Sequence, residues 1–236
     1  LSDHWTYGIV LAPLPSLTMQ LGFWHTDFTD LISTSSIQRE FNAEWAGETN
    51  YVTRCPAGGR PGCPPGEVDY ISLQVNNFAG VESEGLDFNI SYVLDTEKFG
   101  RFDFGLEAAK YTKYIVKAYP ESPELEYQGE LGLPSLRMNP HMYWGKGDWG
   151  AALTGYYIDG QNEDIGSTNY RIGSHIELGL QVSYQLPWDA SIVVGASNLL
   201  DEDPEVNGDV YGWYPFDNTL YDVRGRMTYI RYNQSL

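Results

Sequence analysis

Residues 85–94, GLDFNISYVL, alternate between apolar and polar side chains, and this alternation constrains the fold more than any other feature of the sequence. Successive side chains of a β-strand point to opposite faces of a sheet, so the segment has one apolar and one polar face. The apolar set is Leu86, Phe88, Ile90, Tyr92 and Leu94, and the polar set is Asp87, Asn89 and Ser91. A β-sandwich would turn the apolar set into its core, whereas an outer-membrane barrel would turn it toward lipid and line its lumen with the polar set.

A period of two recurs along the chain and predicts about nine β-strands and no helix. The clearest further example is residues 174–186, SHIELGLQVSYQL, which is longer than most sandwich strands. It is also long enough to cross a bilayer at a tilt of about 45°. In that case Glu177 and Gln181 line the lumen, and the lipid-facing residues are Ile176, Leu178, Leu180 and Val182.

Short and long connections between these strands alternate strictly. The short ones are rich in turn formers and occupy residues 13–16, 95–100, 145–149 and 187–189. The long ones carry most of the proline, glycine, asparagine and acidic residues and occupy residues 34–68, 116–133, 160–171 and 199–219. This pattern is typical of an all-β, antiparallel, up-and-down transmembrane barrel, in which tight periplasmic turns alternate with long extracellular loops.

Aromatic residues gather where the expected strands end. They are Trp5, Tyr7, Trp24, Tyr92, Trp144, Trp149, Tyr184 and Trp188. Membrane barrels carry girdles of aromatic side chains at both interfaces with water, so this distribution favours a barrel.

Composition limits the partners. With 14 basic and 32 acidic residues the formal net charge is -18, which opposes nucleic-acid binding because phosphate contacts require clustered Lys and Arg. The chain is 42% hydrophobic and 14% aromatic, so it is not a disordered acidic protein. It contains no apolar run of the roughly 20 residues that a transmembrane helix needs, and any membrane span must therefore consist of strands.

The two cysteines lie close together in RCPAGGRPGCPPG, residues 54–66. Two thiols without nearby histidines offer too few ligands for a metal site, whereas a short loop rich in glycine and proline brings Cys55 and Cys63 within bonding distance. We therefore predict a disulfide, which implies an oxidising compartment such as the periplasm or the cell surface.

No catalytic or metal-binding pattern is present. The four histidines, His4, His25, His141 and His175, are scattered over different strands without a metal-ligand spacing. G-x-S-x-G does not occur, and the acidic pairs in the loops read as solvated turns, ahead of a Ca²⁺-binding loop. We expect neither an enzyme nor a bound metal or cofactor.

Four stretches, taken in order, resemble the TonB-dependent outer-membrane receptors. They are FTDLIST (28–34), SLQVNNFAGVESEGLDFNISYVL (72–94), VVGASNLLDEDPE (193–205) and LYDVRGRMTYIRYNQSL (220–236). The resemblance implies a bacterial outer-membrane barrel closed by an N-terminal plug. Such receptors import scarce nutrients, for example a ferric siderophore, an oligosaccharide or a cobalamin-like ligand, with energy delivered by TonB. The chain departs from the family pattern at its end, where Leu236 replaces the usual aromatic residue.

The resemblance also sets the extent of the chain. Plugged transporters have about 22 strands, so residues 1–236 would form the C-terminal nine or so. An odd number of antiparallel strands cannot close with both termini at the periplasm, and open edges are not tolerated in lipid. We expect four partners: the missing plug and first strands, the bilayer, the nutrient ligand and TonB. TonB would act through the missing part.

The loop residues Tyr211, Trp213, Tyr214 and Phe216 are the candidates for ligand binding, because aromatic side chains on a loop are costly to expose. They would pack over the plug and neighbouring loops, or stack on a sugar or an aromatic siderophore. Two other functions stay open from sequence: a passive porin with the same architecture, and a secreted carbohydrate-binding β-sandwich with the alternating strands packed inward.

Overall fold

The computed structural model describes residues 1–48, 51–120, 122–165, 168–206 and 216–234. Nine long strands join in chain order into one sheet, and a short strand β7 (Leu125–Glu126) pairs with β6. The long strands are β1 (Ser2–Leu14), β2 (Leu17–Thr34), β5 (Val75–Thr96), β6 (Gly100–Lys117), β8 (Leu136–Lys146), β9 (Trp149–Ile158), β12 (His175–Leu186), β13 (Ala190–Ser197) and β14 (Met227–Gln234). The order β1-β2-β5-β6-β8-β9-β12-β13-β14 is that of an up-and-down meander.

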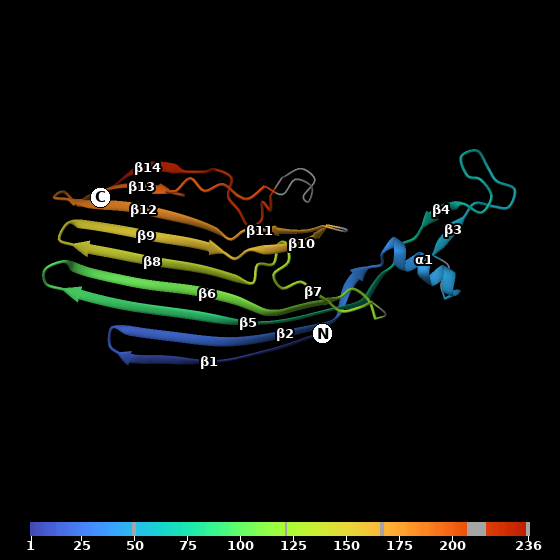
Figure 1. Cartoon of the computed structure of the whole chain (residues 1–236), viewed down its shortest axis with the longest axis horizontal. Helices are drawn as coiled ribbons and strands as arrows, with labels where there is room; N and C mark the ends of the chain where they lie inside the picture. Colours follow the sequence, from blue (N-terminus) through green and yellow to red (C-terminus); the bar gives the residue numbers. More distant parts are fainter. Residues whose placement is uncertain (49–50, 121, 166–167, 207–215, 235–236) are drawn as a thin grey trace. The chain divides into compact units, whose positions relative to one another are not determined.

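The four short connections fall where the sequence predicts them, and they lie together at one end of the sheet (Figure 1). Left-handed residues close three of them: Gly100 with φ 86°, Gly147 with φ 57° and Asp189 with φ 54°. The turn between β5 and β6 is held further by the Thr96 hydroxyl, which donates to the carbonyl of Gly100 over 2.8 Å. Tight hairpins of this kind keep neighbouring strands antiparallel and fix their register.

The register divides the sheet into an apolar and a polar face. Phe104 lies opposite Met142, Met142 opposite Leu153, and Leu153 opposite Leu180. The ring of Tyr92 stacks on Phe104 with centroids 6.3 Å apart, which places the apolar side of β5 on the same face. The adjacent row on the other face consists of Asp103, Tyr143, Ala152, Gln181, Gly195 and Tyr229. We call the face that carries Phe104, Met142 and Leu153 the apolar face, and the opposite face the polar face.

Aromatic side chains line the apolar face near the short turns. Trp149 pairs with Tyr184 at a centroid distance of 4.7 Å, and the indole of Trp188 donates to the hydroxyl of Tyr232 over 3.3 Å. Higher on the hairpin β1–β2, the ring of Trp5 packs on Phe23 at 5.4 Å and on His25 at 5.0 Å. The apolar face therefore carries aromatic rings at two heights.

Trp24 departs from this arrangement. It lies on the polar face, because its ring covers Gly85 and meets the edge of Tyr111 at a centroid distance of 5.4 Å. Trp24 shares the parity of Gly22, whose neighbour across the sheet is Asp87. The expectation that Trp24 belongs to a girdle is wrong, because Trp24 lies well inside β2 and its place in the alternation puts it on the polar face.

The prediction of no helix is also wrong in one place. Helix α1 (Ile37–Ala46) lies inside the first long connection, followed by the hairpin of β3 (Val52–Arg54) and β4 (Val68–Ile71). The hydroxyl of Ser36 accepts the backbone N–H of Arg39 at the start, and Gly47 ends the helix with φ 73°. None of the described helices is long and apolar enough to cross a membrane.

The chain comprises two compact units. One contains Leu1–Asp3, Thr26–Glu82 and Ile115–Leu125, and it includes α1 and the β3–β4 hairpin. The other contains His4–His25, Ser83–Tyr114 and Glu126–Leu236, and it includes β8, β9, β12, β13 and β14. A second hairpin, β10 (Gln161–Ile165) with β11 (Thr168–Ile172), belongs to this unit and was missed by the sequence pattern.

Candidate functional site

The polar face of the sheet gathers hydrogen-bonding side chains from several strands. A hollow of about 230 Å³ between β2, β5, β6 and β8 is lined by Gln20, Asn89, Ser91, Glu107 and His141, among others. Farther along the sheet, the hydroxyl of Tyr229 donates to Oε1 of Gln181 over 3.0 Å. This face can bind a polar partner but would be unfavourable in lipid.

Besides Gly85 under Trp24, two further glycines on the polar face lie beneath side-chain rings of neighbouring strands. The imidazole of His141 covers Gly105, and a Cβ atom at Gly195 would lie 2.6 Å from the hydroxyl of Tyr229. The rings therefore lie flat against the sheet instead of standing away from it, which keeps the polar face shallow. Such aromatic cover also offsets the weakness of glycine in a strand.

Gln161 forms the centre of a buried polar network beyond the strand ends. Its side chain is fully buried; Oε1 accepts the backbone N–H of Gly132 over 2.7 Å, and Nε2 donates to the hydroxyl of Tyr221 over 2.8 Å. The edge of His175 meets the ring of Tyr221 at 5.1 Å, and burial raises the pKa of that tyrosine. Gln161 therefore links the connection that contains Gly132 to the connection that contains Tyr221.

Two described residues that flank positions 207–215, Glu205 and Phe216, make side-chain contacts. Glu205 accepts hydrogen bonds from the hydroxyl of Tyr170 over 3.1 Å and from the backbone N–H of Gly173. The hydrogen bond to Glu205 raises the pKa of Tyr170. On the other side, Phe216 packs against the buried cluster of Ile158, Leu220 and Tyr221. Tyr211, Trp213 and Tyr214 lie outside the described residues, so their role in ligand binding stays a prediction.

A second polar cavity, of about 380 Å³, lies against α1. It is lined by Arg39, Asn42, Ala43 and Ala46 at helical spacing, by Glu48, and by Tyr119, Ser122 and Pro123 from the connection after β6. Nη1 of Arg39 also pairs with the buried carboxylate of Glu40 over 3.4 Å. The guanidinium carbon of Arg39 lies 5.4 Å from the ring centroid of Tyr119, a cation–π contact. An arginine beside an aromatic ring can bind anionic oxygen atoms and planar ligands.

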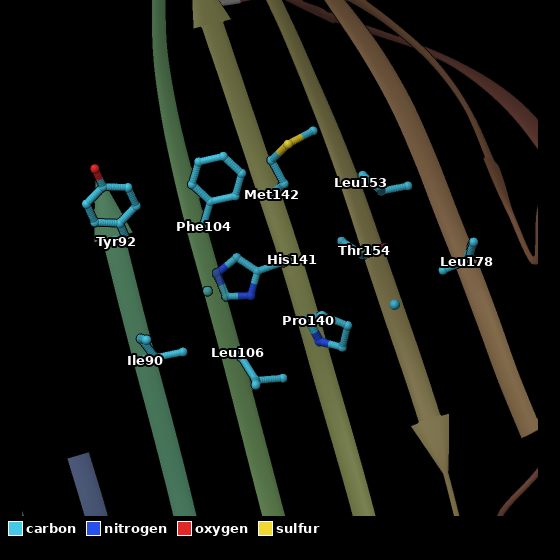
Figure 2. Close-up of a pocket in the computed structure, with 12 residues that line it drawn as sticks. Ile90, Tyr92, Phe104, Leu106, Pro140, His141, Met142, Leu153, Thr154 and Leu178 are labelled. Carbon is cyan, nitrogen blue, oxygen red and sulfur yellow. The ribbon is translucent and has the colours of Figure 1, made fainter. Parts of the chain in front are cut away.

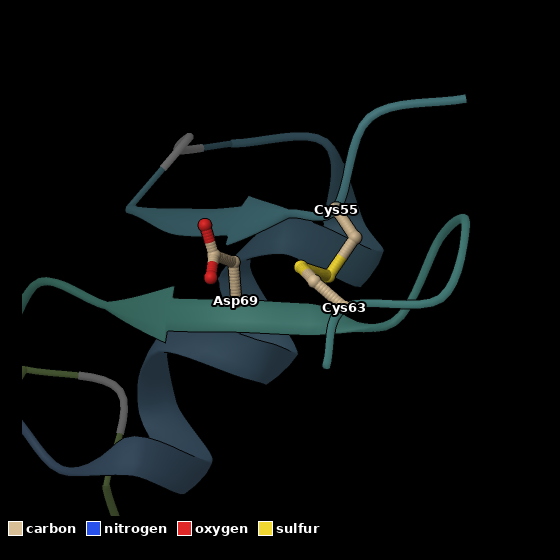
Figure 3. A group of neighbouring side chains, drawn as sticks. All are labelled: Cys55, Cys63 and Asp69. Atoms are coloured by element: carbon tan, nitrogen blue, oxygen red, sulfur yellow. A yellow bond between two sulfur atoms is a disulfide. The ribbon is translucent and has the colours of Figure 1, made fainter. Parts of the chain in front are cut away.

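The loop between β3 and β4 contains the predicted disulfide, which joins Cys55 to Cys63 with Cα atoms 5.6 Å apart (Figure 3). The carboxylate of Asp69 lies near the two sulfur atoms, all within 4.8 Å of one another. Both sulfurs are bonded and Arg60 pairs with Asp69, whereas a metal would need free thiolates. The disulfide and the ion pair between Arg60 and Asp69 therefore cross-link the loop.

Ion pairing also orients α1 toward this loop. The guanidinium of Arg54 donates to both carboxylate oxygens of Glu44, over 2.8 and 2.7 Å, and to the carbonyl of Gly66 over 2.9 Å. The side-chain hydrogen bonds from Arg54 lower the pKa of Glu44. The sequence pattern offered no sign of this pair, because its two members are ten residues apart on different elements.

Comparison with protein families gives a match over residues 1–199 to the model described as TonB dependent receptor-like, beta-barrel. The chain belongs to the TonB-dependent receptors. Members of this family are transporters of the outer membrane of Gram-negative bacteria, and the nine-stranded sheet is part of such a barrel. A search of curated protein sequences finds no significant relative.

Solved receptors have the same fold at low sequence identity. A ferric enterobactin receptor mutant from Pseudomonas aeruginosa, in complex with enterobactin, aligns with a TM-score of 0.64 and 16% identity over 98% of this chain. The siderophore receptor PirA from Acinetobacter baumannii aligns with a TM-score of 0.64 and 15% identity over 98% of this chain, and the copper transporter OprC with 0.56 and 16% over 98%.

The TonB-dependent receptor chain spans about a third of the length of these structures, 31% of the first two and 30% of the third. The remaining length is available for the strands that complete the barrel. In the described part of the chain, β1 and β14 each have a neighbour on one side only, so the sheet ends in two open edges.

Proposed function

We propose that this chain is the C-terminal part of an active outer-membrane transporter that takes up a ferric siderophore. The observation that carries the transport function is the division of one sheet into an apolar and a polar face, with aromatic rings at two heights of the apolar face. Such a sheet has its apolar face toward lipid and its polar face toward the lumen.

On this proposal the lipid-facing residues are those predicted from the alternation in β5 and β12. The lumen-facing set, Asp87, Asn89, Ser91, Glu177 and Gln181, then contacts a plug contributed by the rest of the receptor. Open edges of a sheet are unstable in lipid, so the edges of β1 and β14 pair with the remaining strands of the same barrel. TonB acts through that remaining part.

The ligand class is supported by the printed names of the structural neighbours, which include ferric enterobactin receptors and a siderophore receptor. The cavity beside α1 adds a physical reason. Its tyrosine suits flat rings, and Arg39, which pairs with Glu40 through Nη1, carries further N–H donors for charged oxygen atoms; flat rings and charged oxygens are the features of an aromatic siderophore. The predicted aromatic residues Tyr211, Trp213 and Tyr214 would add stacking surface.

Uptake measurements with the full-length receptor test this proposal. Deletion of its gene should abolish uptake of a radioactive ferric catecholate siderophore under iron limitation, and the full-length gene should restore it. Uptake should stop when the inner-membrane proton gradient is collapsed. Uptake that continues without the gradient would mean a passive porin, and uptake of only copper, cobalamin or an oligosaccharide would overturn the siderophore assignment.

A pair of variants tests the cavity beside α1. Arg39→Ala removes the guanidinium from Tyr119 and should weaken binding of the ferric siderophore by about tenfold, the effect of losing a charged hydrogen bond. Arg60→Ala removes an arginine from the same unit that pairs with Asp69 instead, and it should leave affinity unchanged. Equal affinities of the two variants would remove the cavity from the binding site.

A further inference from the structure

The apolar face of the sheet contains a groove of about 370 Å³, lined from five strands, β5, β6, β8, β9 and β12 (Figure 2). Its walls consist almost entirely of carbon atoms, and the side chains around it include Ile90, Phe104, Leu106, Leu153 and Leu178. A cavity of this size falls within the range of ligand pockets. The groove is therefore large enough to bind a molecule, and apolar enough to bind only hydrocarbon.

The groove exists because one row of the apolar face has small residues, Pro140 and Gly155, at its centre. In that row Leu106 lies opposite Pro140, and Leu178 lies opposite Gly155. Gly155 has no side chain, and a Cβ atom there would lie 2.8 Å from Cγ of Pro140. The neighbouring row, with Phe104 opposite Met142, is filled. Small residues in one row beside large residues in the next produce a depression.

Pro140 is unusual at this place in the sheet. Strand β8 lies between β6 and β9, and proline is normally confined to edge strands because it has no N–H to donate. The register of β8 with β9 is the same on both sides of Pro140, but the ladder lacks the pairs at Asn139 and Pro140. The floor of the groove is thus an irregularity in the centre of the sheet, opposite a glycine.

The height of the groove indicates which half of a bilayer would cover it. Gly155 lies six residues along β9 from Trp149, which belongs to the aromatic rings near the short turns. At about 3.3 Å per residue and a tilt of about 40°, this places Gly155 about 15 Å above those rings, and Leu153, four residues from Trp149, about 10 Å above them. The apolar band of such barrels is about 25 Å tall, so the groove crosses its middle and its Gly155 end lies on the side of the long loops.

We propose that the groove binds one acyl chain of an outer-leaflet lipid of the outer membrane, as a fixed lipid site on the barrel. The inference rests on the proposed orientation of the apolar face toward lipid. The groove is continuous with that bilayer-facing surface, and an acyl chain is the hydrocarbon available at this height. A flexible chain can follow a groove that crosses several strands, whereas a neighbouring protein would have to present a complementary ridge.

The test compares filling variants of the full-length receptor, extracted from outer membranes in mild detergent and washed by gel filtration. Leu178→Trp places an indole in the groove, and Ile90→Trp fills it from the opposite wall. Val182→Trp is the matched control, because it lies on the same strand and face but outside the groove. Native mass spectrometry counts the retained lipids, and fatty-acid analysis distinguishes the hydroxylated chains of outer-leaflet glycolipid from phospholipid chains.

We expect the unmodified receptor and Val182→Trp to retain a hydroxylated lipid in a one-to-one ratio. Retention should fall by about an order of magnitude in Leu178→Trp or, should that variant not fold, in Ile90→Trp. Equal retention in all variants, retention of phospholipid only, or no retained lipid would overturn the lipid site. Siderophore uptake by the same variants distinguishes the two proposals, because a barrel without a lipid site would still transport, whereas a failed transport function would leave lipid retention unchanged.

Discussion

The long strands and the unit around α1 are stabilised in different ways. Few side chains on the strands are buried, and large apolar residues such as Val194 and Ile230 are 54% and 76% exposed. The unit around α1 instead uses a capped helix, a disulfide and a bidentate ion pair between Arg54 and Glu44. Its buried residues include Ala43, Val52 and both cysteines.

This contrast indicates that the strands suit lipid and the unit around α1 suits water. Exposed apolar surface is stable where lipid covers it, and the strands satisfy their backbone groups within the sheet. A small unit in water cannot bury enough apolar surface by itself, so covalent and polar constraints replace a large core. Variants can therefore separate the two regions, because each should respond to a different kind of change.

Placing a charge on the apolar face should have the largest effect. Leu180 lies four residues along β12 from Tyr184, about 10 Å above the aromatic rings by the rise and tilt of barrel strands. Leu180→Arg should destabilise the receptor in vesicles: its free energy of unfolding, measured with urea on the full-length receptor, should decrease by about 2–4 kcal/mol. Gln181→Arg, one residue away on the polar face, loses only a hydrogen bond to Tyr229, about 1 kcal/mol. Equal losses would show that both faces meet the same solvent.

Removing the disulfide should destabilise the unit around α1 and spare the strands. The bond closes a loop with a sequence separation of 8, for which the loss of chain entropy predicts about 2–3 kcal/mol. A variant with Cys55→Ser and Cys63→Ser should exchange the backbone amides of β3 and β4 faster, measured by hydrogen exchange. The heat-induced shift in gel mobility that reports the folded barrel should not change. Loss of that shift would contradict the independence of the two regions.

Gln161 tests whether the long connections beyond the strands are held by polar contacts. Gln161→Leu leaves the N–H of Gly132 and the hydroxyl of Tyr221 without their partner, and the penalty for such buried groups is about 1–3 kcal/mol. Hydrogen exchange at residues 129–133 and 217–222 should therefore increase. Gln185→Leu, at an exposed position of β12, should leave exchange unchanged. An equal response of both variants would argue against a local network.

The strands and their order follow from the sequence because period-two alternation and turn chemistry are local signals. The four short connections fall at the predicted positions, and the β12–β9 register and the contact of Tyr92 with Phe104 place the apolar residues of β5 and β12 on one face. The exception is instructive: Trp24 was assigned from its place near a strand end, whereas its parity with Gly22 puts it on the polar face. Alternation is the stronger rule.

The long connections were predicted poorly because their structure depends on contacts between distant residues. Helix α1 is short, and its signals, Ser36 before it and Gly47 after it, are common in loops as well. The buried Gln161 is fixed by Gly132 and Tyr221, which are 29 and 60 residues away. The groove at Pro140 and Gly155 likewise needs the register of β8 with β9, which the sequence alone does not give.

The smallest effect concerns the pH dependence of the ion pair between Glu44 and Arg54. Arg54 lowers the pKa of Glu44 in the folded state, so the pair stabilises the unit above the ordinary pKa of 4.5, and this stabilisation disappears as pH falls through the lowered value. Arg54 is exposed and Glu44 partly exposed, so solvent screening keeps the effect small. Protection of the amides of α1 should decrease between pH 7 and about pH 3. Glu44→Gln should flatten this dependence, whereas Glu67→Gln, at an exposed residue of the same unit, should preserve it; an unchanged profile in Glu44→Gln would assign the acid sensitivity to another group.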